Sequence, residues 1–286
     1  MQKLWQKRKR MKKLSLLLLV VTSISWSQNL KLMTYNIRLD VASDGLNAWS
    51  YRKDFMGEQI KEVNPDIIGF QEALPHQINE LLERLSNYQK SGIGREINGI
   101  GEASCIFFNP SKFELQKEAT FWLSETPNEV SKGWDAACNR VCSYVLLKDR
   151  VTQKSFWVFN THLDHVGEVA RDKGIELILQ TIANQNTQNL PVIFMGDFNS
   201  LPSTQRIIHL KSLLLDAYDV PTHLKSGPIA TFNGFQNNYN PNDRIDYIFV
   251  SPKKCTVKNY TVLVSSREKR FPSDHFPVYI EIELHS

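Results

Sequence analysis

Strand-like segments outnumber helical ones along the whole chain, and this imbalance limits the fold more than any other feature of the sequence. Short apolar segments of strand length recur almost to the C-terminus, with polar loops between them. Helical spacing of apolar residues is found at 55–63, 74–88 and 169–184. We expect strands at 30–37, 66–73, 104–109, 143–149, 155–163, 191–199, 244–251, 260–265 and 277–284.

This order of elements predicts an α/β fold with four layers, in which two mainly antiparallel β-sheets pack face to face and helices lie outside. The alternative is a doubly wound parallel sheet, which needs a helix after most strands. The second half of the chain does not supply those helices. The segments 143–149 and 155–163 flank a polar turn and are expected to form a hairpin. No repeat or low-complexity linker interrupts the pattern, so we expect one domain over 28–286.

The first 27 residues have the features of a secretory signal peptide. A basic run leads into the apolar stretch 14–21, and Ser25 and Ser27 place small residues before a cut at Gln28. The apolar stretch is much shorter than the roughly 20 residues that span a bilayer. We therefore expect a signal peptide at 1–27, export to the periplasm or beyond the cell, no membrane span after cleavage, and a monomer.

Removal of this segment changes the charge of the protein. Residues 1–27 hold seven Lys or Arg and no Asp or Glu, so the formal net charge falls from +4 to −3. A mildly acidic chain has no global field that would attract nucleic acid, although a local basic groove could still do so.

Four cysteines remain after cleavage, and their spacing matches no zinc-binding pattern. In an oxidising compartment they could form one or two disulfides. They could equally be small buried apolar residues, and the sequence leaves both readings open. These residues are Cys105, Cys138, Cys142 and Cys255.

Polar residues stand repeatedly at the ends of the apolar segments. One such residue alone is most simply a turn residue or a helix cap. Six strand ends of this kind in one chain point instead to a site, because loops at strand ends are where a rigid scaffold presents catalytic groups. The residues are Asn36, Glu72, His162, Asp197 with Asn199, Asp246, and Asp274 with His275.

The chemical types of these residues fit metal-assisted hydrolysis. Mg²⁺ prefers oxygen ligands and needs only one or two carboxylates, which Glu72 and Asp274 could supply. Asp197 could orient or deprotonate a water molecule. A histidine paired with a carboxylate can hold its charged form and bind a phosphate oxygen, and His275 with Asp246 would make such a pair.

Six segments carry a family resemblance in identity and in order: TYNIR, DIIGFQEA, NTHLDH, GDFNS, RIDYIFVS and SDHFPV. Together they resemble the endonuclease/exonuclease/phosphatase superfamily, with its deoxyribonuclease I-like fold, over about 30–284. Each motif alone is weak, but all six in order are specific. The NTHLDH extension is similar to an exported bacterial branch related to the deadenylase-like members.

The resemblance implies a metal site for Mg²⁺ or Mn²⁺. Glu72 would be the principal ligand, Asn36 would help hold the metal or its water, and Asp274 would be a ligand or lie behind one. Arg38 stands where several repair nucleases of the family place an acidic residue, which argues against a further ligand there.

The resemblance also implies the catalytic roles. Asp197 would orient or deprotonate the attacking water, and Asn199 would contact that water and the phosphate. His275 would bind the phosphoryl oxygen, with Asp246 fixing its tautomer. His162 would face the phosphate as a general acid or a hydrogen-bond donor.

Two further residues are candidates for substrate binding. Arg140 precedes a strand in a segment similar to bacterial relatives, and an arginine can bind phosphate through two donors; its alternative is a surface arginine. His165 extends the NTHL motif, and it could touch substrate or cap the following helix.

These observations lead to a ranked set of functions. The first is a metal-dependent phosphoesterase, with a phosphodiester or phosphomonoester substrate that is small or carbohydrate-like. The alternative is an extracellular nuclease with the same catalytic set, supported only by a loose C-terminal group of Lys and Arg residues. A non-catalytic module that binds a phosphate ligand is the second alternative, and the complete polar set argues against it.

Overall fold

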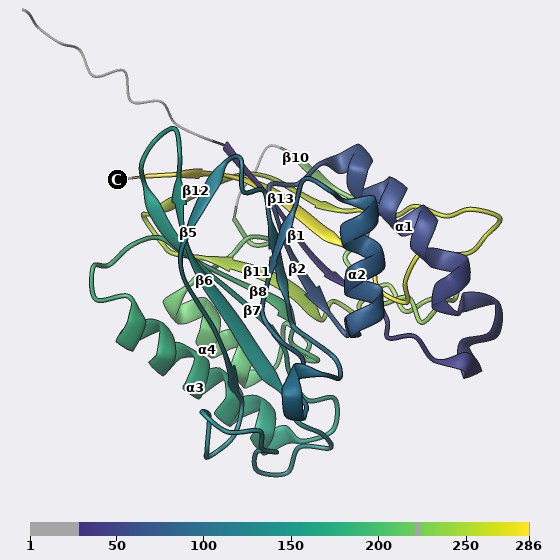
Figure 1. The fold of residues 1–286 in the computed structure, drawn as a ribbon, viewed down its shortest axis with the longest axis horizontal. Coiled ribbons are helices and arrows are strands. Elements are labelled where there is room, and N and C mark those ends of the chain that lie inside the picture. Colours follow the sequence, from purple (N-terminus) through teal and green to yellow (C-terminus); the bar gives the residue numbers. More distant parts are fainter. Residues whose placement is uncertain (1–28, 221–223, 286) are drawn as a thin grey trace, which may run out of the picture.

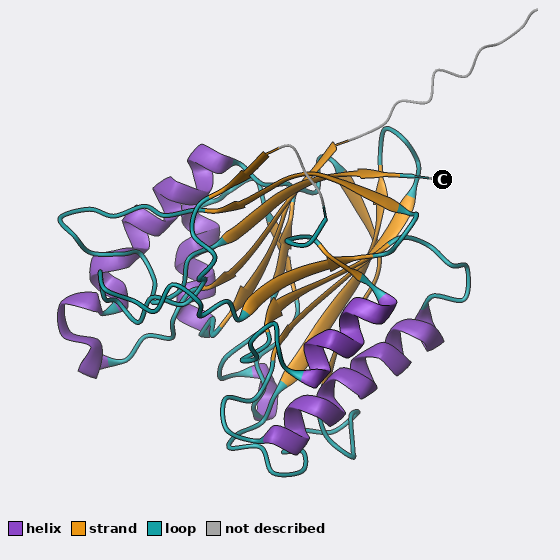
Figure 2. Ribbon diagram, turned by 180° about the vertical axis from the view of Figure 1, so that it is seen from behind, coloured by secondary structure: helices purple, strands orange, loops and turns teal. Residues whose placement is uncertain are grey.

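The computed structural model describes residues 29–220 and 224–285, and the expected signal peptide at 1–27 lies outside them. Two β-sheets pack face to face in the middle of the molecule (Figure 1). One pair of helices covers the outer face of the first sheet, and a second pair covers the outer face of the other (Figure 2). The four-layer α/β sandwich is therefore confirmed.

The first sheet has seven strands in the order β10-β12-β13-β1-β2-β4-β3. Its central strand β1 pairs antiparallel with β13 and parallel with β2. The strands are β1 (Asn29–Asn36), β2 (Ile67–Gln71), β3 (Gln89–Ser91), β4 (Ile106–Phe108), β10 (Leu224–Ser226), β12 (Cys255–Val262) and β13 (Val278–Leu284).

The second sheet has six strands in the order β5-β6-β7-β8-β11-β9. All its pairings are antiparallel except that of β7 with β8. The expected hairpin is present as β6 and β7. The strands are β5 (Phe113–Trp122), β6 (Val141–Asp149), β7 (Ser155–His162), β8 (Val192–Asp197), β9 (Leu215–Asp216) and β11 (Asp246–Val250).

The helices lie where apolar side chains of each outer sheet face need cover. Helix α1 (Trp49–Val63) and helix α2 (Pro75–Arg84) pack on the first sheet, and α3 (Glu168–Gln185) and α4 (Gln205–Leu213) on the second. Helix α1 ends at Val63. The next residue, Asn64, caps it with a left-handed φ of 48° and stands directly before Pro65. Short 3₁₀ turns, η1 (Ala42–Asn47) and η2 (Ile97–Gly99), complete the elements. Within the described residues, no helix has the length and apolar character that crossing a membrane requires.

A buried polar link joins the two sheets behind the strand ends. Asn160 of β7 donates from Nδ2 to the carbonyl oxygens of Phe70 and Cys105, both at 2.9 Å, and its Oδ1 accepts from Nε2 of Gln71 at 2.7 Å. Gly69 allows this approach, because a Cβ there would lie 2.7 Å from Oδ1 of Asn160. The amide therefore fixes how one sheet lies on the other.

The structure also departs from the sequence-based expectations. Helix α1 begins at Trp49 rather than at Phe55. Strand β5 was not expected. Most of its central residues are charged or polar and exposed, so the sequence there has too few apolar positions to indicate a strand. Helix α4 was also missed: it buries few residues, and it lies in the half of the chain where helices were not expected. All four cysteines are free, so the disulfide reading is not supported.

Candidate active site

The predicted polar strand ends meet at one edge of the sandwich. Strands β1 and β2 run parallel, as do β7 and β8, so Asn36, Glu72, His162 and Asp197 follow the same ends of their strands. Asp246 begins β11 directly opposite Asp197 in the register. A cavity of about 480 Å³ opens there. Among its lining residues are Glu72, Arg140, His162, His165, Asp197, Asn199, Asp274 and His275.

Asn36 lies buried beneath the cavity and links two of its carboxylates. Its Nδ2 donates to Oε1 of Glu72 and to Oδ2 of Asp197, both at 3.0 Å, while its Oδ1 accepts from the backbone N–H of Arg38. The second oxygen of Glu72 accepts from the backbone N–H of Leu39 at 3.0 Å. In this orientation Asn36 positions the carboxylates and turns its amide oxygen away from them.

Three residues of the site have left-handed backbone conformations. Arg38, Glu72 and Asn199 have φ values of 56°, 60° and 44°, in the left-handed region that non-glycine residues avoid. Each follows a strand end that carries a site residue. The surrounding hydrogen bonds hold these conformations, as is common where a site needs an unusual side-chain direction.

The carboxylates fit a hard divalent cation. Burial raises the pKa of Asp274, the positive charges of His275 and Arg38 oppose this rise, and the negative charge of Glu72 adds to it. Oxygen donors that repel one another in a cavity are the donor set that Mg²⁺ or Mn²⁺ uses. Arg38 lies 3.9 Å from Oδ2 of Asp274, but its closer partner is Asp44 at 3.0 Å.

His275 and Asp246 form the expected pair. Nδ1 of His275 lies 2.9 Å from Oδ2 of Asp246, and both side chains are buried. Burial alone would lower the pKa of His275, but the carboxylates of Asp246, Asp197 and Asp274 together raise it to about 10. Ligand atoms of Asp197, Asp246 and His275 also lie within 4.8 Å of one another. Because Nδ1 is already bound to Asp246, we interpret this group as an oriented imidazolium.

Asp197 lies at the centre of the site with a modified acidity. Burial, and next the charge of Asp246, raise its pKa to about 7, which suits a group that accepts a proton near neutral pH. Its Oδ1 accepts from the backbone N–H of Asn199 at 2.9 Å.

His162 lies beside Asp197 in a different state from His275. Burial and the charge of Arg140 hold its pKa well below the ordinary value. Nδ2 of Asn199 also donates to the carbonyl oxygen of Leu163, and it lies 3.0 Å from Nε2 of His162. Nε2 therefore accepts a hydrogen bond, and the geometry favours a neutral His162 in a binding role over one as general acid.

Arg140 and His165 line the cavity and contact each other, and Asp164 contacts Arg140. Nη2 of Arg140 lies 2.9 Å from Nδ1 of His165, so this nitrogen accepts and the imidazole proton is on Nε2. Nε of Arg140 lies 3.3 Å from Oδ2 of Asp164. Arg140 is buried and charged within the cavity wall, which excludes the reading as a surface arginine.

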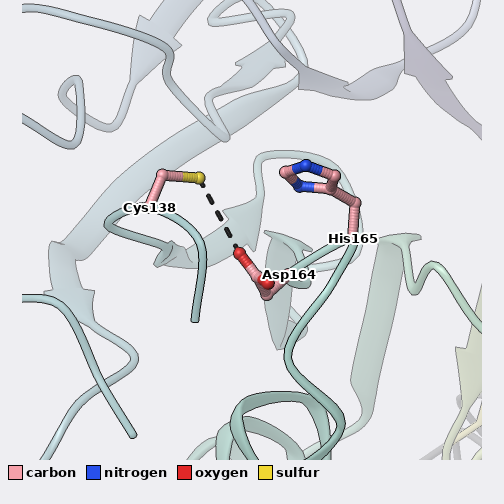
Figure 3. A group of neighbouring side chains, drawn as sticks. All are labelled: Cys138, Asp164 and His165. Carbon is pink, nitrogen blue, oxygen red and sulfur yellow. Dashed lines mark hydrogen bonds between the residues drawn. The ribbon is translucent and has the colours of Figure 1, made fainter. Parts of the chain in front are cut away.

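Figure 3 shows Asp164 between Cys138 and His165. These three side chains could together approach one metal ion. The carboxylate of Asp164, however, already accepts from the backbone N–H groups of Ala137, Val166 and Gly167 and from Arg140. This arrangement is that of an anchor for two loops.

Three residues of the site region were not among the sequence-based candidates. Asp164 was visible within the NTHLDH motif but had no assigned role. Arg95 and Glu102 line the cavity from the hairpin 92–103, which has glycines and polar residues but no apolar strand end that would mark it.

Comparisons with known proteins indicate the family and the fold of the chain. The sequence profile of the endonuclease/exonuclease/phosphatase family matches residues 33–275. Nocturnin of Drosophila melanogaster is 21% identical over 282 residues, which cover 82% of this chain and 42% of that protein. The chain spans 33% to 59% of the length of the curated relatives that it matches.

Two solved structures are closely similar over the whole domain. An endonuclease/exonuclease/phosphatase from Bacteroides vulgatus has a TM-score of 0.85 and 35% identity, covering 90% of this chain and 100% of that one. A mannosyl-6-phosphatase from Bacteroides thetaiotaomicron has a TM-score of 0.82 and 37% identity, covering 88% and 99%.

Proposed function

The chain belongs to the endonuclease/exonuclease/phosphatase family of phosphoester hydrolases, and we propose that it is an exported enzyme. It would use Mg²⁺ or Mn²⁺ to hydrolyse a small, carbohydrate-like phosphate ester. The observation that carries the proposal is the cavity in which Glu72, Asp197 and Asp274 face His162 and His275. Similarity to a mannosyl-6-phosphatase supports the choice of a carbohydrate-like substrate.

The chain's own residues would divide the work of the reaction. Asp197 would accept a proton from the water that attacks phosphorus in line, and Asn199 would contact that water and the phosphate. The imidazolium of His275 would donate to a phosphoryl oxygen as negative charge builds there. Glu72 and Asp274 would hold the divalent ion, which when bound polarises the phosphoryl group and offsets its charge.

Charge distribution weighs against the nuclease alternative. Three of the C-terminal Lys and Arg residues, Lys258, Arg267 and Arg270, are paired with Glu283, Glu58 and Glu268, which lowers the net positive charge of this group. A nuclease would need unpaired cations along a groove to neutralise successive phosphates. The formal charge of −3 after signal cleavage points the same way.

The test uses residues 28–286 with the variants Glu72→Ala and His275→Ala, and with Glu114→Ala on exposed β5 as a matched control. Each protein is assayed with Mg²⁺, Mn²⁺ or chelator on sugar phosphates, p-nitrophenyl phosphate, bis-p-nitrophenyl phosphate, nucleotides, DNA and RNA. We expect metal-dependent hydrolysis, and a loss of about 10²-fold or more in both site variants. Absence of turnover on every substrate, or turnover confined to nucleic acids, would contradict the proposal.

Export and the monomeric state are separate parts of the proposal. Fractionation of cells that express the full chain should place the cleaved protein outside the cytoplasm, with an N-terminus at Gln28. Light scattering of the cleaved protein should give the mass of one chain. A retained N-terminal segment or a dimer mass would refute the corresponding part.

A further inference from the structure

The hairpin 92–103 forms part of the cavity wall and is held by backbone hydrogen bonds. Backbone hydrogen bonds close it, including Gly94 N–H to Gly99 O and Arg95 N–H to Glu102 O, both at 3.0 Å. Its last residue, Ala103, pairs with Ala73, the residue after Glu72. Side chains of this hairpin therefore have a fixed position relative to the carboxylate that we assign to the metal.

Two oppositely charged side chains of the hairpin face the cavity together. Nη2 of Arg95 lies 2.5 Å from Oε1 of Glu102, and the two side chains are only 17% and 13% exposed. Both also line a small neighbouring pocket of about 10 Å³, together with Glu72, Arg140 and His162. The pair is thus next to the reacting centre, on the side of Arg140.

Arg95 has a second carboxylate neighbour in the hairpin. Nε of Arg95 is buried without a hydrogen bond among the residues described, and it lies 3.5 Å from Oε1 of Glu96. Burial raises the pKa of Glu102, while the charge of Arg95 opposes this rise. The parts of Arg95 and Glu102 that remain exposed line the cavity, where their other donors and acceptors can bind water or a ligand.

We infer that Arg95 and Glu102 form the subsite for the leaving group, and that they bind neighbouring hydroxyl groups of a sugar or similar polyol phosphate. A guanidinium offers donors and a carboxylate offers acceptors, and each hydroxyl both donates and accepts. Because the pair carries no net charge, it does not favour a second phosphate.

The lining also argues against other leaving groups. A nucleobase binds best on aromatic faces, and a lipid tail needs an apolar wall. Among the described residues that line the cavity, Phe232 is the only Phe, Tyr or Trp, and its ring contacts that of His275. The inference rests on the proposed phosphatase function and specifies its substrate class.

The experiment compares matched substrates that differ in hydroxyl groups. Mannose 6-phosphate and glucose 6-phosphate are measured against hexyl phosphate, which has the same carbon count and no hydroxyls, and against p-nitrophenyl phosphate. The variants are Glu102→Gln and Arg95→Gln, with Glu114→Gln as the same change at an exposed position of β5. Thermal unfolding checks that each variant is folded.

We expect the wild-type protein to prefer the hexose phosphates, and Glu102→Gln to lower their kcat/KM by about 10- to 100-fold, as for loss of a hydrogen bond to a charged group. The fold-decrease of kcat/KM on hexyl phosphate should be at least 10 times smaller than the decrease on the hexose phosphates. Arg95→Gln should show the same difference between the two kinds of substrate.

Equal losses on both kinds of substrate would overturn the inference, because Glu102 would then act through Glu72. A wild-type protein that hydrolyses hexyl phosphate as well as hexose phosphates would also overturn it, while leaving the phosphatase function intact. A wild-type protein without activity on any phosphate ester would instead refute the proposed function itself, and the subsite with it.

Discussion

Replacement of Asp246 by asparagine tests whether His275 acts as a charged group. The two side chains are buried and 2.9 Å apart, and Asp246 is the largest of the charges that raise the pKa of His275 to about 10. An asparagine oxygen can still accept from Nδ1 of His275, so the ring keeps its orientation. The variant should therefore lose the charge of the histidine, and it should also lower the pKa of Asp197, which the charge of Asp246 raises.

The size of the effect follows from the change in protonation. At pH 8 the wild-type histidine is almost fully charged. If the pKa of His275 returns to its ordinary value of about 6.5, only about 3% of the molecules carry the charge at that pH. We therefore expect kcat/KM at pH 8 to fall by about 30-fold or more, and less at pH 6, where about three quarters would be charged.

The sign of the pH dependence is also fixed by this argument. A raised pKa keeps the histidine charged as the pH rises through neutrality, and the charge is lost only near the folded value of about 10. In the variant the charge is lost in the range below pH 8. The alkaline limb of the kcat/KM profile should therefore move to lower pH.

The assay is a profile of kcat/KM from pH 5.5 to 9 at saturating Mg²⁺ for the wild-type protein and Asp246→Asn. Asp54→Asn, the same change in an exposed ion pair with Arg84, serves as the control and should overlie the wild-type curve. A loss of equal size at pH 6 and pH 8 would refute the reasoning, because it would show that charge on His275 is not what Asp246 provides.

Three further predictions concern stability and metal binding. Asp216→Ala leaves Arg244 buried without the partner that it contacts at 2.8 and 3.1 Å, and the variant should lose about 3–5 kcal/mol of unfolding free energy in urea; a loss below about 1 kcal/mol would contradict this. Asp164→Ala removes the acceptor of three backbone N–H groups, and we expect about 2–4 kcal/mol of destabilisation together with a raised KM. An unchanged KM would show that the position of Arg140 does not depend on Asp164. Mg²⁺ at about 100 times its Kd should stabilise the wild-type protein by about 2.7 kcal/mol, seen as a higher Tm; the same rise in Glu72→Ala would place the ion elsewhere.

The polar strand ends of the site could be predicted from the sequence because two signals coincided there. Asp197 and Asp246 each stand at the border of a continuous apolar segment, where a charged residue has no role in the core. Six such strand ends in one chain pointed to a site, because loops at strand ends present catalytic groups. The family motifs added their order and their roles.

Other parts of the fold and site gave no such signal. Strand β5 has an exposed, charged outer face, so its apolar positions are too few to stand out. Arg95 and Glu102 reach the cavity only because a hairpin folds back beside Glu72, and this approach depends on tertiary hydrogen bonds. The position of Asn36, which donates to two carboxylates at once, likewise requires both sheets to be in place.

The link from Asn160 to Phe70, Cys105 and Gln71 gives the site a further property. Glu72 belongs to one sheet and Asp197 to the other, so neither sheet holds a complete reaction centre. The separation of these two carboxylates depends on how the two sheets align, and the hydrogen bonds of the Asn160 side chain hold that alignment. Catalytic activity therefore requires both sheets in their correct relative position. A small displacement of one sheet over the other would abolish activity while each sheet kept its own hydrogen bonds.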